Sequence, residues 1–185
     1  MANKVKYGIE NLYYSVISTT GTYGSPIAWK GAVSISLSPQ GSQNNFYADN
    51  SVYFSLEANT GYQGDLVTAL IPDTFRTDCL GEAQDANGMY VETAGATRKE
   101  FALLFQFEGD ENATRHCLYR CTATRPNVEG STVEDTIEPQ TETITITAMP
   151  RLADHVVKSR CPYSASTTSA YALWFDAVQE PTASA

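Results

Sequence analysis

The chain has 185 residues, of which 42% are hydrophobic and 18% charged, and its 12 Lys and Arg against 21 Asp and Glu give a formal net charge of -9. This length fits one domain, which we expect to span residues 1–185, and the composition is that of a globular protein. No run approaches the roughly 20 apolar residues of a membrane helix, and the N-terminus has no apolar signal segment. We therefore expect a protein that folds in a cytoplasm and has no membrane partner.

The N-terminal part of the chain is predicted to form strands. Residues 5–17 are rich in Tyr, Val and Ile, and residues 65–71 form another short apolar run. Residues 32–38 alternate large apolar side chains with serines, which is typical of a strand with one buried face. The apolar residues of that alternation are Val33, Ile35 and Leu37.

Residues 41–64 are polar and rich in Asn, Ser and Gly, yet they contain Phe46, Tyr47, Tyr53 and Phe54. One interpretation is an ordinary hairpin stabilised by aromatic cross-strand pairs. The other is an arm that leaves the domain and lays these four aromatic residues on a neighbouring subunit, because Tyr and Phe are enriched at subunit interfaces. Sequence alone leaves both interpretations open.

Two helices are predicted. Pro72 and Asp73 suit the start of a short helix that Gly81 can end. Near the C-terminus, Thr168 or Ser169 can cap a longer helix with an apolar stripe at helical spacing. The residues of that stripe are Ala170, Leu173, Trp174, Ala177 and Val178. We expect Trp174 to pack on a sheet.

Three further strands are predicted between residues 99 and 150. The first, around residues 101–107, is apolar on both faces and should lie in the middle of a sheet. In the second, Cys117 and Cys121 fall on one predicted face about 13 Å apart, which is beyond disulfide reach. The third places Ile144 and Ile146 on one face and a row of threonines on the other. That row, expected to face water, consists of Thr141, Thr143, Thr145 and Thr147.

No catalytic or cofactor motif stands out, so we expect neither enzymatic activity nor a cofactor. The only histidines, His116 and His155, lie in separate segments without a nucleophile elbow. A zinc site that uses His116 with Cys117 and Cys121 is disfavoured, since neighbouring residues on a strand point to opposite faces. The Asp85, Asn87 and Gly88 pattern lacks the closing glutamate of a calcium loop. Phosphate-binding and dinucleotide-binding loops are also missing.

These patterns predict a mainly β fold, and they fit either a structural subunit or a carbohydrate-binding or receptor-binding β-sandwich module of a virion. Long segments then carry a resemblance in consistent order. They are KVKYGIENLYYSVI, GAVSISLSPQGSQNNFYADN, EANTGYQGDLVTALIPDTFR, FALLFQFEGDENATRH, ATRHCLYRCTATRP and EGSTVEDTIEPQTETITITAMPR. Through them the chain, from about Lys4 to Val178, resembles the major tail protein, or tail-tube protein, of phages with long non-contractile tails that infect Gram-positive bacteria.

The resemblance implies a β-sandwich or partly closed β-barrel flanked by one main α-helix, with a short second helix. It implies rings, six-membered in the family, that stack into a tube whose lumen conducts DNA into the host. The implied partners are further copies of the chain, the tape-measure protein, the tail terminator and, transiently, DNA. A subunit of a tailocin or of a secretion-system inner tube is the related alternative. In a tube, the threonine row from Thr141 to Thr147 is the candidate lumen wall, and bulk solvent outside is the alternative.

Overall fold

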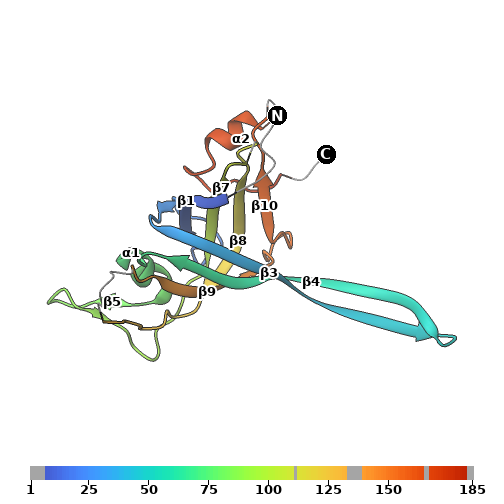
Figure 1. Ribbon diagram of the computed structural model, residues 1–185, viewed down its shortest axis with the longest axis horizontal. Coiled ribbons are helices and arrows are strands. Elements are labelled where there is room, and N and C mark those ends of the chain that lie inside the picture. The colour runs from blue at the N-terminus through green and yellow to red at the C-terminus, as the bar shows by residue number, and fades with distance from the viewer. Residues whose placement is uncertain (1–6, 111, 133–138, 165–166, 183–185) are drawn as a thin grey trace.

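The computed structural model describes residues 7–110, 112–132, 139–164 and 167–182 and is mainly antiparallel β (Figure 1). An eight-stranded sheet has the order β2-β1-β7-β8-β9-β4-β3, with β10 also paired to β8, and β5 and β6 form a separate hairpin. The strands are β1 (Tyr7–Val16), β2 (Ile27–Ala28), β3 (Ala32–Ala48), β4 (Ser51–Thr68), β5 (Ala83–Gln84), β6 (Tyr90–Val91), β7 (Phe101–Glu108), β8 (Arg115–Ala123), β9 (Glu142–Met149) and β10 (Lys158–Cys161). The helical elements are α1 (Asp73–Phe75), the π-helical turn η1 (Arg76–Leu80) and α2 (Thr168–Ala172).

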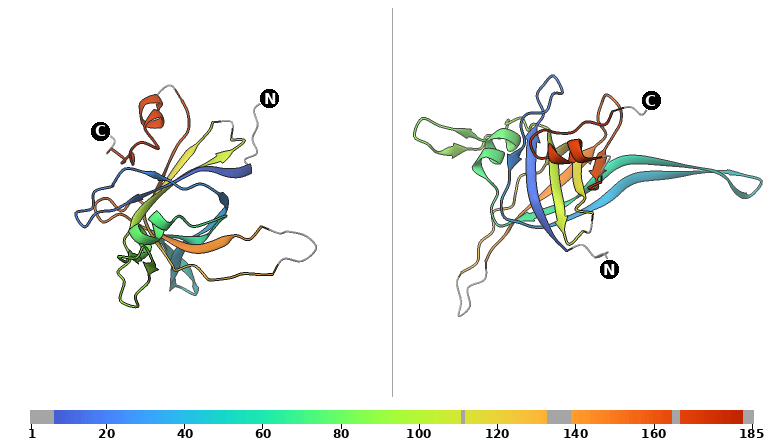
Figure 2. Two further views of the ribbon diagram at one scale, coloured as in Figure 1. Left: turned by 90° about the vertical axis from the view of Figure 1, so that its left-hand side faces the viewer. Right: turned by 90° about the horizontal axis from the view of Figure 1, so that it is seen from above.

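The sheet bends between β8 and β9, so that β3, β4 and β9 cross beneath the upright β1, β7, β8 and β10 (Figures 1 and 2). This bend brings β3 into contact with β1, although the two lie near opposite ends of the strand order. The sheet therefore stays open and encloses its core from two sides. The prediction of a mainly β, sandwich-like fold is confirmed.

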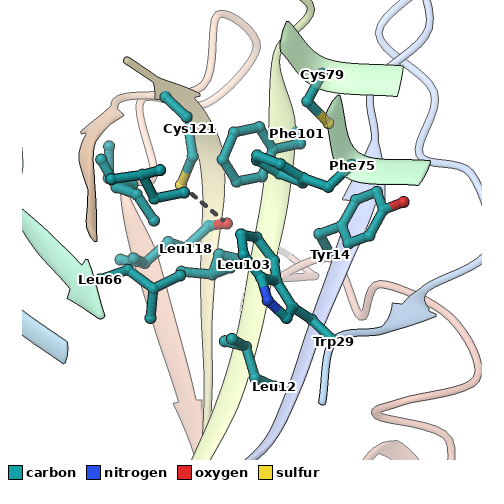
Figure 3. Packing of buried hydrophobic residues seen from close by; sticks show 14 of the residues in the cluster. Leu12, Tyr14, Trp29, Leu66, Phe75, Cys79, Phe101, Leu103, Leu118 and Cys121 are labelled. Atoms are coloured by element: carbon teal, nitrogen blue, oxygen red, sulfur yellow. Dashed lines mark hydrogen bonds between the residues drawn. The ribbon is translucent and has the colours of Figure 1, made fainter. Parts of the chain in front are cut away.

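The main core lies inside this bend and is centred on the ring of Phe75 (Figure 3). Phe75 lies 5.0 Å from Tyr14, 4.5 Å from Trp29 and 5.1 Å from Phe101 between ring centroids. Such edge-to-face and tilted contacts add to the gain from burying the rings. The first helix holds Phe75 in place, since it begins after Pro72 and ends at Gly81, whose φ of 84° is left-handed. Both predicted ends of this helix are confirmed.

A second core cluster lies on the other face of β7, β8 and β10 and is covered by α2 and the turns after it (Figure 2). Trp174 is buried there, as predicted, and Phe175 stacks on Tyr13 at 4.8 Å. The helix is shorter than the prediction, because it ends at Ala172 and leaves Leu173 exposed. Trp174 and Phe175 contact the sheet from the turns that follow the helix.

The prediction that Cys117 and Cys121 share a face is wrong. Cys117 lies in the second cluster and Cys121 in the main core. The cause is a bulge in β8, because Phe101 pairs with Cys121 but Leu103 pairs with Leu118, which leaves one extra residue in β8. An extra residue inverts the alternation of faces beyond it. All four cysteines of the chain are free and buried.

One strand that the sequence analysis did not predict follows β9. It is β10, which pairs with the first half of β8, while β9 pairs with the second half. The short strand β6 pairs with β5. Residues 127–132 form neither helix nor strand, and residues 133–138 lie outside the described part of the chain.

Phe75→Ala should lower the free energy of unfolding by about 3–5 kcal/mol, because it removes a fully buried ring from the centre of the main core. Phe54→Ala is the matched control, since Phe54 is 56% exposed, and should change stability by less than about 0.5 kcal/mol. Urea denaturation of the unassembled protein, followed by circular dichroism, measures the free energy of unfolding of both variants. Equal losses in the two variants would contradict the described core.

The buried thiols should react slowly. Burial raises the pKa of Cys79 to about 12, and it also raises the pKa of Cys117 and of Cys121. These groups are therefore protonated at pH 8, and the thiolate is the reactive form. We expect a disulfide reagent to modify the three residues at least about a hundredfold more slowly than the denatured chain at that pH. Mass-spectrometric mapping measures the rates, and rapid native labelling of any of the three would refute this placement.

Candidate functional site

One hairpin extends well beyond the body of the protein (Figure 1). β3 and β4 pair along their whole length, but β9 pairs with β4 only from Tyr62 to Thr68. Residues 41–60, which we call the arm, therefore have no sheet partner except each other among the described strands. At about 3.4 Å per residue, the arm projects by roughly 25 Å. The strands predicted at residues 32–38 and 65–71 are thus the inner ends of two much longer strands.

Glycines allow the arm to leave the sheet where it does. A Cβ on Gly64 would lie 1.8 Å from the carbonyl oxygen of Ser36, and one on Gly61 would lie 1.9 Å from that of Ala148. Gly61 also has a φ of 129° and lies beside a bulge, since Gly61 pairs with Gln40 whereas Asn59 pairs with the next residue of β3, Gly41. β4 can therefore approach β3 and β9 closely at the point where β9 ends.

The tip of the arm is a two-residue turn. Asp49 and Asn50 have φ angles of 50° and 58°, the left-handed values that a type I′ turn requires and that these residue types tolerate. Ala48 pairs with Ser51 across the turn, and the Ser51 hydroxyl donates a hydrogen bond to the Ala48 carbonyl. This turn matches the twist of the two strands and fixes their register.

The four aromatic residues singled out in the sequence all lie near this tip and are exposed. Phe46 pairs with Phe54 on one face of the arm, and Tyr47 pairs with Val52 on the other. Their exposed fractions are 63% for Phe46, 65% for Tyr47, 73% for Tyr53 and 56% for Phe54. The stretch is thus a hairpin with an aromatic cross-strand pair that also projects, which combines both interpretations of its sequence. Contact with a neighbouring subunit stays a prediction.

The threonine row lies on the face of β9 that points away from the main core. Ile144 and Ile146 are buried, whereas Thr143 is exposed and Thr145 and Thr147 are half-buried. Thr141 is exposed and precedes the strand. The alternation of the third predicted strand is therefore present in the structure.

The strand register extends this row into a polar surface across β8, β9, β4 and β3. Thr145 pairs with Asp65, which pairs with Ser36, and the Thr145 hydroxyl donates a 2.8 Å hydrogen bond to the Asp65 carboxylate. We call this surface the hydroxyl face, and it consists of Ser34, Ser36, Ser38, Gln63, Asp65, Val67, Thr122, Thr124, Thr141, Thr143, Thr145 and Thr147. These residues include one carboxylate and no Lys or Arg. Arg120, which the register of β8 with β9 places beside Thr122 and opposite Met149, is paired with Glu100. Sequence reasoning had identified only the β9 row of the hydroxyl face.

The described residues were expected to hold neither a catalytic nor a metal site. His116 stacks on Phe105 at 5.2 Å, so its ring is a packing element of β8. Within the described ranges, no three His, Cys, Asp or Glu side chains gather closely enough to hold a metal ion. The helices of the described part are all too short to cross a membrane. The candidate functional surfaces described above are the arm and the hydroxyl face.

Comparison with models of known protein families gives a match over most of the chain. The profile of the phage tail tube proteins matches residues 4–165, which include every strand of the eight-stranded sheet. Comparison with curated proteins gives no match. The match covers most of the 185 residues and begins at the same residue as the resemblance noted in the sequence. The chain therefore belongs to the phage tail tube protein family, as a structural component of the virion tail.

Proposed function

We propose that this chain, as a single domain of residues 1–185, assembles into stacked hexameric rings whose lumen conducts DNA into the host cell. The tail would be long and non-contractile, and the host a Gram-positive bacterium in whose cytoplasm the tube assembles. The tape-measure protein would occupy the lumen before DNA does, and the tail terminator would end the stack. This role is structural and needs neither catalysis nor a cofactor.

The hydroxyl face carries the proposal as the lumen wall. DNA binds proteins chiefly through Lys and Arg that neutralise its phosphates. A surface of serines, threonines and one carboxylate, Asp65, holds water but offers phosphates no cation. Such a wall lets a polyanion slide, because the acidic chain repels it over about 8 Å at physiological salt. This observation favours the lumen over bulk solvent for the row from Thr141 to Thr147.

The edges of the sheet support ring formation. β3 is the last strand in the sheet order, so one of its edges has no partner among the described strands. An unpaired edge is a template for a strand of another chain, and head-to-tail pairing closes into a ring when the rotation divides a full turn. The arm, with Phe46, Tyr47, Tyr53 and Phe54 exposed, would add a second contact between subunits. An isolated two-stranded ribbon is only marginally stable in water, which also favours a partner for the arm.

The exposed aromatic residues of the arm also fit a second function, in which they stack on sugars of a receptor. A tailocin or secretion-system tube is the related structural alternative. Negative-stain microscopy of the purified chain, with a glycan-binding assay in parallel, separates these functions. Rings or tubes without glycan binding support the tail tube, and a persistent monomer that binds glycans would overturn it.

Shortening the arm should abolish assembly but not folding. Replacing residues 43–57 by Asn-Gly keeps a type I′ turn between Ser42 and Ala58, and it leaves the β4–β9 pairing intact. We expect a melting temperature within about 3 °C of the full-length chain, since no core residue is removed. Tubes should be missing in electron micrographs. Normal tubes from the shortened chain would show that the arm is not an interface.

Lysines on the hydroxyl face should retain DNA. Thr143→Lys with Thr145→Lys leaves the buried isoleucines of β9 untouched, so tubes should still form. Each phosphate contact made by the new lysines should add about 0.9 to the slope of binding against salt, so the tube should hold DNA at low salt. The control is Ser169→Lys with Ala172→Lys, which adds the same charge at exposed positions of α2. If the hydroxyl-face variant retains no more DNA than the control, this face does not line the lumen.

A further inference from the structure

A pocket of about 1190 Å³ opens on the body of the protein, between three segments that the lumen and the arm do not use. They are the turn at residues 17–24 after β1, residues 97–100 before β7, and residues 151–153 after β9, with Arg120 between them. The volume exceeds the roughly 300–1,000 Å³ of small-molecule sites. We call this site the basic pocket, and its size fits a segment of protein chain.

The basic pocket concentrates the positive charge of an acidic chain. Four of the 12 Lys and Arg line it, namely Arg98, Lys99, Arg120 and Arg151, with Glu100 as the acidic residue. Two of these cations are already neutralised. Arg120 forms hydrogen bonds of 2.7 and 2.8 Å with Glu100, and Arg151 pairs with Asp154 at 3.2 Å and with Glu180.

Arg98 and Lys99 are different, since both are exposed and neither has a carboxylate within ion-pair distance among the described residues. Arg98 donates one hydrogen bond, at 3.2 Å, to the carbonyl oxygen of Ala123.

The wall of the basic pocket is held by hydrogen bonds within the turn after β1. Ser18 and Thr22 are joined by hydrogen bonds of 2.9 and 3.1 Å across the turn. A preformed pocket loses little entropy when a segment binds.

The arm has the complementary chemistry. No Lys or Arg occurs between residues 31 and 75, and the tip carries Asp49. Tyr47 and Tyr53 flank that carboxylate and are the most exposed aromatic residues of the arm. Guanidinium and ammonium groups bind carboxylates and also aromatic faces. The tip could therefore meet both uncompensated cations of the pocket and apolar atoms such as those of Leu152.

The arm cannot fill the pocket of its own chain. It projects away from the body, while the pocket is built from segments of the body itself (Figures 1 and 2). We infer that the tip of the arm, residues 46–54, docks into the basic pocket of a second copy, with Asp49 facing Arg98 and Lys99. This inference rests on the proposed tube, and it names the contact that would join its subunits.

Photo-crosslinking tests the contact directly. The wild-type chain is first shown by microscopy to form tubes. Tubes are then made from equal amounts of unlabelled and ¹⁵N-labelled chains that carry benzoylphenylalanine at Tyr47, and crosslinked peptides are mapped by mass spectrometry. We expect mixed-isotope crosslinks from the tip to residues 17–24, 97–100 or 151–153. Crosslinks from tubes to any other surface overturn the pocket but leave the tube standing, whereas a wild-type chain without tubes overturns both.

A double-mutant cycle tests the charges without disturbing the turn, because Asn is as suited as Asp to a type I′ position. We expect Asp49→Asn to raise the critical concentration for tube formation about threefold in the wild-type chain. In a chain that carries Arg98→Gln and Lys99→Gln, the same change should have less than about a 1.5-fold effect, since its partners are gone. Equal effects in the two backgrounds would show that Asp49 does not face this pair.

Discussion

The structure depends on a strand that has two partners over one part of its length and only one over the rest. β4 is hydrogen-bonded to both β3 and β9 from Tyr62 to Thr68, and to β3 alone beyond Gly61. The doubly paired part builds the hydroxyl face and closes the main core through Leu66. The singly paired part becomes the arm. The arm and the central part of the hydroxyl face therefore share one continuous strand, and the close approaches at Gly61 and Gly64 set the boundary between them.

Charge is distributed unevenly along the chain, and this asymmetry matches the division of surfaces. The hairpin of β3 and β4 contains no Lys or Arg, so both its sheet part and its arm are neutral or acidic. The exposed cations of the basic pocket come from residues next to β7, on the other part of the sheet. In the proposed tube, polar hydroxyls on one surface and cations on another would let the same chain repel a polyanion and attract a carboxylate of a second copy. The two properties would conflict if they shared one surface.

Burial explains which elements sequence reasoning could predict. β7 was predictable because it is buried on both faces and its residues are therefore apolar throughout. β9 was predictable because it is buried on one face, so that apolar residues such as Ile144 and Ile146 alternate with threonines. The arm was predicted as a hairpin in only one of two interpretations, since neither of its faces is buried and its residues show no alternation. Its turn at Asp49 and Asn50 was the local signal that could have revealed it. The bulge in β8, the four-residue β10 and the early end of α2 arise from tertiary pairing, which leaves little trace in a short stretch of sequence.

The projecting tip also changes how two copies first meet. Association of two compact bodies requires their surfaces to come together in one orientation, which limits typical rate constants to about 10⁵–10⁷ M⁻¹s⁻¹. A ribbon that extends roughly 25 Å beyond the body enlarges the distance at which first contact occurs. Its base lies near Gly61, where β4 enters the part that is also paired with β9. For any partner of the tip, the arm thus allows a first contact at the tip to precede the slower docking of the two bodies.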